Sequence, residues 1–240
     1  MTINFSSIFS ACWLAPSYRR GMGEALLFLA LLFAIPVSAQ QVLEVYNIQG
    51  STAQARLTID GNEIFTTYVY IGKDGVGKTT EMDALTPTDT LHVVKAFGIK
   101  PNPGTTIPYI DITPTTFACD EDCQYYNMII DTAAVHHPGC KGEDMYHITP
   151  EYNYGIATDY NHQRIYPNGS NIFIHCKGNK PYTGGCIALD EDKMIEILRR
   201  CNNSLIVVVN KVNEIRTKST FSRKSVNQVR HNSKPKLSIK

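Results

Sequence analysis

Three closely spaced runs of β-branched and aromatic residues constrain the fold of this chain most strongly. Residues 42–46, 55–60 and 63–71 have the composition that is typical of strands. An Asp-Gly-Asn turn at 60–62 separates the last two runs, and Asp-Gly between two such runs predicts a tight hairpin. The chain is therefore expected to contain an antiparallel hairpin near the start of its folded part.

The rest of the chain continues the β pattern. Residues 72–118 are dense in Gly, Pro and Thr, which favours short strands joined by ordered loops over helices. Further strands are expected at 152–161, 171–176 and 204–210. Together with the 240-residue length, which is enough to bury a core, this predicts one mostly-β domain.

One helix is expected after Asp190, which can cap it. Met194, Ile197, Leu198 and Cys201 follow at positions that share one helix face. We therefore expect a mostly-β fold with one or two short helices.

The N-terminal segment has the pattern of an export signal. Arg19 and Arg20 precede an apolar run at 25–36, which ends in the small residues Val-Ser-Ala at 37–39. This run is much shorter than the roughly 20 residues that a membrane-spanning helix needs. We expect residues 1–39 to be a cleaved signal peptide and the remaining chain to work in the periplasm or cell envelope; an uncleaved anchor is the alternative.

Charge is divided unevenly along the chain. Residues 40–214 carry 13 Lys and Arg against 21 Asp and Glu, whereas residues 215–240 carry eight basic residues and no acid. An acidic folded part argues against a dedicated nucleic-acid binder, so no nucleic-acid partner is expected. We expect a domain at 40–214 and a flexible tail at 215–240. The tail either contacts anionic envelope polymers or has no partner.

Six cysteines follow the signal segment, and export changes how they are interpreted. In an oxidising compartment Cys119, Cys123 and Cys140 are more often disulfide partners than metal ligands. A zinc site is the alternative, because His136, His137 and His147 lie in the same segment. The spacing matches no standard zinc module, so no metal is expected. The pairing among Cys119, Cys123, Cys140, Cys176 and Cys201 stays open.

Residues 72–79 match the phosphate-loop pattern GxxxxGK[ST] letter for letter. That pattern binds phosphate only where a helix begins at the lysine and its amides face the ligand. Here Pro87 follows after about seven residues, too few for such a helix. We interpret the segment as a glycine-rich turn between strands and expect no nucleotide partner.

A histidine and a cysteine in the last third of the chain suggest nucleophilic catalysis. His175 ends an expected strand, and Cys186 follows eleven residues later, directly after Gly184 and Gly185. A thiol needs a nearby base to become a nucleophile, and an activated thiol reacts well below the free-cysteine pKa of about 8.5. Glycines allow bare amides to approach a substrate oxyanion. Strand alternation directs Cys176 away from His175.

This region resembles the catalytic domain of the L,D-transpeptidases (the YkuD family), in the branch with a Gly-Gly-Cys motif. The matching residues are His175 and the Thr-Gly-Gly-Cys sequence at 183–186. Similar features lie upstream, namely Gly-Val-Gly-Lys at 75–78, Thr-Pro-Thr at 86–88, Ala-Phe-Gly at 96–98, Tyr126-Asn127, Tyr160-Asn161 and the Gly-Ser-Asn-Ile-Phe-Ile-His run at 169–175. The resemblance implies a β-sandwich or barrel-like fold.

The resemblance also implies a function. Family members act on peptidoglycan stem peptides at a bond between an L-centre and a D-residue, without a cofactor. Cys186 would be the nucleophile that forms a thioester, His175 the base, and the amides near Gly184 and Gly185 an oxyanion hole. Tyr182, Thr183 and Ser170 would orient the substrate; ordinary structural hydrogen bonding is the alternative for these hydroxyls.

Three departures from the family pattern leave the acceptor open. The gap between His175 and Thr183 is seven residues, shorter than in the commonest form of the motif. Gly184 replaces a second histidine, and Ala188 stands where many members have an arginine. An amine acceptor gives a cross-link or D-amino-acid exchange, and water gives an L,D-carboxypeptidase. A non-catalytic wall-binding domain is a further alternative. A separate hypothesis is that Asp159, Tyr160 or Asn161 supports His175 from an adjacent strand.

Overall fold

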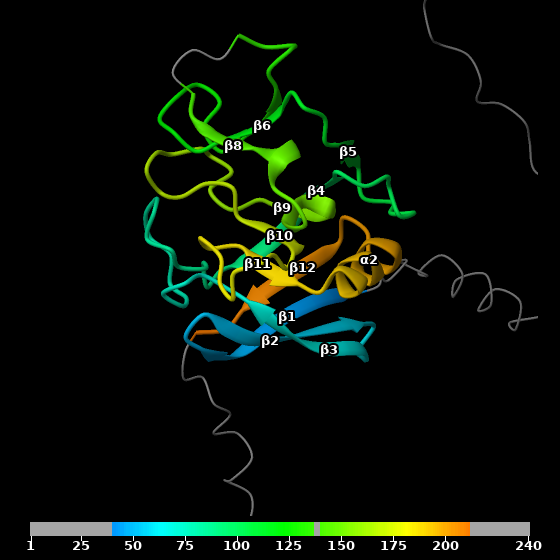
Figure 1. The fold of residues 1–240 in the computed structure, drawn as a ribbon. Coiled ribbons are helices and arrows are strands. Elements are labelled where there is room, and N and C mark those ends of the chain that lie inside the picture. The colour runs from blue at the N-terminus through cyan, green and yellow to red at the C-terminus, as the bar shows by residue number, and fades with distance from the viewer. Residues whose placement is uncertain (1–39, 137–139, 212–240) are drawn as a thin grey trace, which may run out of the picture. The chain divides into compact units, whose positions relative to one another are not determined.

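The structure is a computed structural model that describes residues 40–136 and 140–211 (Figure 1). Its elements, in chain order, are β1 (Gln41–Gln49), β2 (Thr52–Ile59), β3 (Asn62–Tyr70), β4 (Thr90–Gly98), β5 (Tyr109–Asp111), β6 (Thr116–Cys119), β7 (Ile129–Asp131), β8 (Gly142–Asp144), the 3-10 turns η1 (Met145–His147) and η2 (Glu151–Asn153), β9 (Gly155–Thr158), β10 (Phe173–Cys176), β11 (Ile187–Leu189), α2 (Glu191–Arg200) and β12 (Leu205–Val209). The mostly-β prediction is confirmed.

The predicted hairpin connects β2 to β3. Ile59 pairs with Asn62, which leaves a two-residue turn. Asp60 and Gly61 both have positive φ angles, of 52° and 76°. This is the backbone conformation that the tightest hairpin turns require, and Asp-Gly adopts it readily. The turn prediction is confirmed.

The large sheet closes on itself like a barrel. The strand order is β12-β1-β2-β3-β11-β10-β9-β4, and β4 pairs again with β12, while β5 lies beside β4. Closure removes exposed sheet edges. The barrel-like fold that the family resemblance implied is thereby confirmed.

Two strands differ from the sequence prediction. In the region expected to hold only short strands, β4 is nine residues long, because Leu91 and Val93 alternate with exposed neighbours. In contrast, β9 covers only Gly155–Thr158 of the predicted 152–161. The chain forms η2 just before it and turns sharply at Asn161, whose φ is 46°.

The main core lies between the strands and α2. Alternate residues of β1, β2 and β12 are buried, and Met194, Ile197 and Leu198 of α2 belong to the same apolar cluster. Asp190 is the N-cap residue of α2 by backbone position, although its side chain makes no capping hydrogen bond. Cys201, at the other end of α2, is also buried in this core.

A second, smaller sheet covers the chain segments near β9 and β10. It consists of β7, β6 and β8 in that order and lies at the upper end of the view in Figure 1. A second apolar cluster joins it to the large sheet through Ala118, Met145, Tyr152, Phe97 and Phe173. The aromatic rings pack edge to face, with Phe97 centred 5.4 Å from Tyr152 and 5.1 Å from Phe173. This aromatic packing holds η2 against β4 and β10.

The predicted signal peptide at 1–39 and the predicted basic tail at 215–240 lie outside the described residues. Within residues 40–136 and 140–211, no helix has the length and apolar character that crossing a membrane demands.

Candidate active site

Neighbouring parallel strands bring His175 and Cys186 to one cavity. His175 lies on β10, and Cys186 immediately precedes β11. In the β10–β11 register His175 pairs with Ala188, so strand alternation places Cys186 and His175 on the same face. Both residues line a cavity of about 400 Å³. Cys176 lies in the main core instead, as the alternation predicted.

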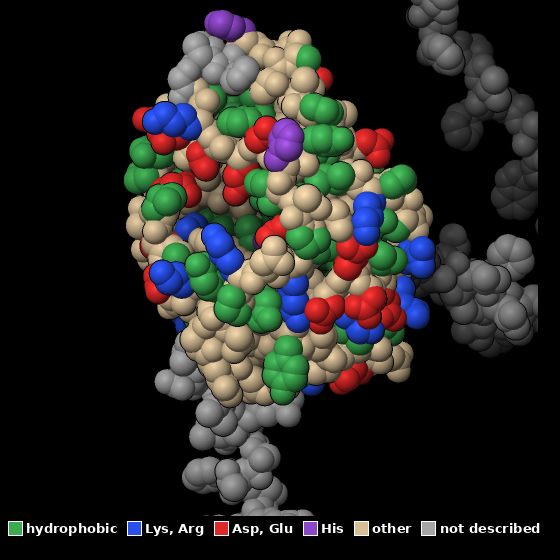
Figure 2. Space-filling view, viewed as in Figure 1, with side chains coloured by type: hydrophobic (Ala, Val, Ile, Leu, Met, Phe, Trp, Pro, Cys, Tyr) green, Lys and Arg blue, Asp and Glu red, His purple; other side chains and the backbone are tan. Residues whose placement is uncertain are grey.

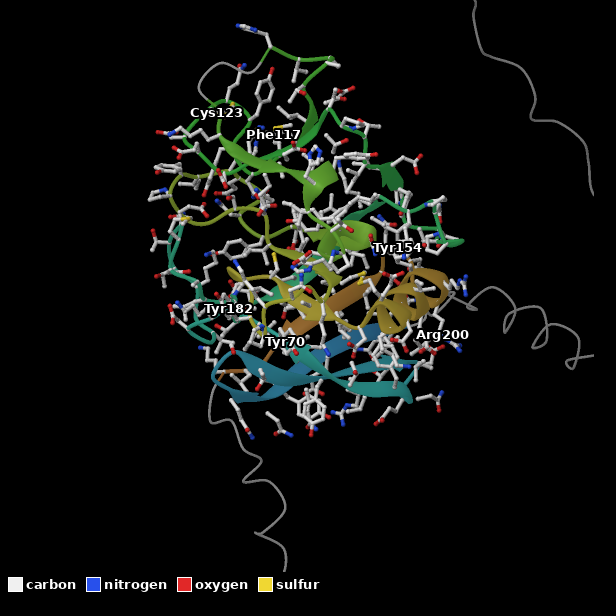
Figure 3. The ribbon with its side chains drawn as sticks, viewed as in Figure 1. Tyr70, Phe117, Cys123, Tyr154, Tyr182 and Arg200 are labelled. Atoms are coloured by element: carbon white, nitrogen blue, oxygen red, sulfur yellow. A yellow bond between two sulfur atoms is a disulfide. The ribbon has the colours of Figure 1, made fainter. Side chains whose placement is uncertain are left out.

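The cavity also contains most of the predicted substrate-binding residues. Tyr182, Thr183, Gly184 and Ser170 line it together with the histidine and the cysteine. Tyr182 lies on the loop that leads into β11 (Figure 3), and Lys73 Nζ lies 5.7 Å from the centre of its ring. The family resemblance implied a common role for these residues, and the fold brings them to one cavity.

The His175 imidazole is buried and fixed in orientation. Its Nδ1 lies 2.7 Å from the backbone oxygen of Cys176. A carbonyl only accepts hydrogen bonds, so Nδ1 carries the proton and Nε2 is left as the basic nitrogen. The Tyr152 ring packs edge-on against the imidazole, with centroids 5.7 Å apart. Burial lowers the pKa of His175 below its ordinary value, which keeps the ring neutral and able to accept a proton.

The Cys186 thiol is free and partly buried. It donates to the backbone oxygen of Asn171 at 3.1 Å and accepts from the Phe173 amide at 3.3 Å. Burial raises the pKa of the thiol to about 12, and the charge of Glu143 adds to this. Thiol and imidazole are both neutral at rest, so the proton must move as the bond to substrate forms.

Thr183 organises the Gly-Gly turn before Cys186. Its Oγ1 donates to the backbone oxygen of Cys186 at 2.7 Å and accepts from the Gly185 amide at 3.1 Å. Gly185 has a φ of 144°, and a Cβ there would lie 2.8 Å from the Leu85 oxygen, so only glycine fits. Because the Gly185 amide is occupied, the candidate oxyanion donors are the amides of Gly184 and Cys186.

The side chains of Asp159, Tyr160 and Asn161 have other hydrogen-bond partners and do not support His175. Asp159 accepts hydrogen bonds from the amide and imidazole of His92. The Tyr160 hydroxyl donates to Asn168, and the Asn161 side chain holds its own loop. The partner of His175 is instead the carbonyl of the next residue. A contact to a backbone carbonyl cannot be predicted from the pattern of side chains in the sequence.

Sequence reasoning missed Glu143 and Tyr152, which line the same cavity. They come from β8 and η2, two short elements without periodicity. The Tyr152 hydroxyl donates a hydrogen bond to the Glu143 carboxylate. A sequence signal was lacking because three-residue elements do not show a hydrophobic repeat.

Two of the predicted disulfide cysteines are bonded. Cys123 is linked to Cys140, while Cys119 is free and buried, with its sulfur within 4.8 Å of both others. Burial raises the pKa of Cys119 to about 11, so it is a poor nucleophile. The disulfide joins the segments that carry Asp120 and Glu143, on one wall of the cavity.

Removing this disulfide is expected to lower the free energy of unfolding. The bond closes a loop with a sequence separation of 17, for which chain entropy predicts about 3 kcal/mol. Urea unfolding of C123S/C140S should show this loss, and dithiothreitol should reduce wild-type stability by the same amount. C119A should remain sensitive to dithiothreitol. If C119A abolishes that sensitivity, the pairing is wrong.

The phosphate-loop look-alike is a turn, as predicted. No helix lies between β3 and β4 in the described chain. The Lys78 side chain is only 2% exposed, and its ammonium group pairs with Asp83 at 2.8 Å. Asp83 also accepts from the amides of Thr79, Thr80 and Leu85. The lysine therefore closes a loop at the edge of the cavity.

Asp83→Asn is expected to destabilise the protein by about 2 kcal/mol. Burial raises the pKa of Asp83, but the hydrogen bonds from Lys78 and the three amides outweigh it and lower the pKa to about 2. The contribution of Asp83 to the free energy of unfolding is thus present above the ordinary pKa near 4 and is lost as the pH falls through about 2. Urea unfolding at neutral and acidic pH measures it. The exposed Asp89 provides a control, Asp89→Asn, and equal losses from the two substitutions would contradict the assignment.

Comparison with known proteins places the chain in a family. The sequence model of the L,D-transpeptidase catalytic domain (YkuD) matches residues 45–209. No curated protein matches the chain. One similar solved structure is an L,D-transpeptidase from Mycobacterium smegmatis, with 12% identity and a TM-score of 0.39; the match covers 72% of this chain and 60% of that one. Another is the helical cell shape determining protein Pgp2 from Campylobacter jejuni, with 14% identity and a TM-score of 0.41; the match covers 76% of this chain and 51% of that one.

A third similar structure is the Ldtfm-avibactam carbamoyl enzyme, with 12% identity and a TM-score of 0.38; the match covers 74% of this chain and 51% of that one. This chain spans between half and three fifths of the length of these proteins. The family match includes β10, β11 and both residues of the His175–Cys186 pair. The chain therefore belongs to the L,D-transpeptidase catalytic domain family.

Proposed function

We propose that this protein is an exported cysteine L,D-transpeptidase that acts on peptidoglycan stem peptides. One observation supports this most directly. A free thiol, Cys186, and a neutral imidazole with its Nε2 unprotonated, His175, line the same cavity. This is the pair of groups that acyl transfer through a thioester requires. The signal-like segment at 1–39 supports export, and the basic tail would contact anionic envelope polymers.

In the proposed first step Cys186 Sγ attacks the carbonyl carbon of the L-centre as its proton moves to Nε2 of His175. The amides of Gly184 and Cys186 would hold the developing oxyanion, and losing one such donor costs roughly 3 kcal/mol in the transition state. The protonated imidazole then donates to the departing D-amino acid. The C–N bond breaks and a thioester on Cys186 remains.

In the second step an amine attacks the thioester carbonyl and releases the thiol. The nitrogen comes from a neighbouring stem peptide, which gives a cross-link, or from a free D-amino acid, which gives exchange. The described residues supply the nucleophile, the base and the oxyanion donors of this scheme.

Incubation with stem tetrapeptides and mass analysis of the products tests the proposal. Cross-linked dimers, or tetrapeptides with an exchanged D-residue, are expected from the purified protein. Tripeptide alone would show that water is the acceptor and that the enzyme is an L,D-carboxypeptidase. Unchanged tetrapeptide would contradict both activities and favour a non-catalytic wall-binding domain.

A further inference from the structure

One wall of the cavity carries acidic side chains that the reaction scheme above does not use. Glu81, Asp120 and Glu143 all line the cavity, and they come from the loop before β4, the end of β6 and β8. Figure 2 shows a hollow with acidic side chains on its upper rim and basic ones on its lower rim. The nearby Lys78 is already paired with Asp83. Glu151 and Lys180 line the cavity as well, so acidic side chains outnumber basic ones among its described lining residues.

Glu143 is the member of this wall that is linked most closely to the reacting groups. The Tyr152 hydroxyl donates to its carboxylate, and the ring of the same tyrosine packs against the His175 imidazole. The charge of Glu143 also acts on the Cys186 thiol. Glu143 therefore lies in the same cavity as the nucleophile and is hydrogen-bonded to the tyrosine that packs against the base.

The charged groups around Glu143 set its protonation. Burial raises its pKa to about 7; the hydrogen bond from Tyr152 opposes this, and the charges of Asp120 and Glu81 add to it. Burial and the charges of Glu81 and Glu121 likewise raise the pKa of Asp120, while Lys141 opposes them. A carboxyl group with a pKa near 7 exchanges protons readily at neutral pH, as general bases do.

Two further observations indicate that this wall faces a ligand. Ser170 Oγ is buried, lines the cavity and has no hydrogen-bond partner among the described residues. The Tyr126 hydroxyl, close to it in the fold, donates to Glu81 and accepts from the Gly169 amide. At Gly184, an added Cβ would meet nothing within 4 Å. The cavity therefore has open space beside the thiol and an unsatisfied hydroxyl in its lining.

We propose that Glu143 and Asp120 form the acceptor subsite, which binds the ammonium group of the incoming amine and delivers it to the thioester as a free amine. Glu143 takes the proton and Asp120 contributes charge. The inference rests on the proposed function and deepens it, because it names the residues that would hold the acceptor ammonium group and take its proton. Opposite charge and buried hydrogen-bond acceptors are what recognise an ammonium ion.

The ammonium group transfers one proton to the Glu143 carboxylate, and its nitrogen lone pair attacks the thioester carbonyl. The tetrahedral intermediate loses a second nitrogen proton to Nε2 of His175. The C–S bond then breaks, the electron pair returns to Cys186 Sγ, and His175 passes its proton to that sulfur. The products are an amide, a neutral thiol and a protonated Glu143, which releases its proton to water.

Glu143→Gln tests the proposal, with Asp144→Asn as the matched control. The glutamine oxygen can still accept from Tyr152 but cannot take a proton. Asp144 is the exposed neighbour, and it bonds to His147. Each protein is given tetrapeptide donor with either a D-amino acid, which is cationic at its amine, or hydroxylamine, which is uncharged at neutral pH. The readout is the ratio of transfer to hydrolysis.

For E143Q the ratio with the D-amino acid should fall about 100-fold, with a raised acceptor KM, while hydroxylamine transfer changes much less. In wild type the ratio should rise as the pH increases through about 7, and E143Q should lose this rise. Equal losses with both nucleophiles, or an unchanged ratio in E143Q, overturn the inference but leave the proposed function standing. Absence of any donor cleavage in wild type contradicts the proposed function and the inference together. If E143Q does not fold, Asp120→Asn must give the same selective loss in smaller degree.

Discussion

Replacing Cys186 by alanine is expected to lower the rate of donor tetrapeptide cleavage by about 10⁴-fold or more, because no other group can form the thioester. Of the described cysteines, only Cys186 lines the cavity. Cys176 and Cys201 are buried in the main core, and burial raises the pKa of each to about 12. The loss should therefore be specific to position 186.

Product analysis with purified variants measures this effect. Cys201→Ala is the matched control, since it removes a buried free thiol at the end of α2, away from the cavity. It should retain activity, although with reduced stability from the lost packing. Cys186→Ser keeps the shape of the side chain but offers a much less acidic group, and it should also be nearly inactive. Residual activity of C186A near wild type would remove the nucleophile from the scheme.

Replacing His175 by glutamine is expected to lower the rate of donor cleavage by roughly 10²- to 10⁴-fold, the range for loss of a general base. Without an imidazole, the Cys186 proton has no acceptor, and burial keeps the thiol protonated. His92→Gln is the control, because His92 lies on β4 and pairs with Asp159. Measuring the rate of donor cleavage at saturating and at low substrate concentration distinguishes a loss of chemistry from a loss of substrate binding.

The pH profile provides a second readout for His175. Burial lowers its pKa below the ordinary 6.5, so the imidazole stays neutral and basic as the pH falls through 6.5. The acid limb of wild-type kcat/KM for the donor should therefore lie below pH 6.5 and should be absent in H175Q. An acid limb above pH 6.5, or one that persists in the variant, would assign the base to another group.

The sequence predicted those parts of the fold that a local pattern encodes. The hairpin at Asp60-Gly61, the strand β12 and the stripe of α2 follow from turn chemistry and periodicity, and all are present. The two-sheet arrangement could not be predicted in this way. Strands β6, β7 and β8 have three or four residues each, and their pairing depends on contacts between segments far apart in the chain.

In the candidate site too, some features could be predicted from the local sequence and others depend on tertiary contacts. His175 lies on β10, and Cys186 and the glycines immediately precede the neighbouring strand β11. The resemblance of these residues to the family motif, more than their spacing, indicated a shared location. The Glu143–Tyr152 pair, the Cys176 carbonyl that orients His175 and the bond from Thr183 to the Gly185 amide depend on tertiary geometry.

Acylation by a carbapenem tests the central claim most directly. The strained amide of this β-lactam gives a stable adduct with a nucleophilic thiol, and intact-protein mass spectrometry followed by peptide mapping locates it. We predict one adduct per chain, on Cys186, which is lost in C186A and strongly slowed in H175Q. An adduct on Cys119, Cys176 or Cys201, or no adduct at all, would contradict the assignment of Cys186 as the nucleophile.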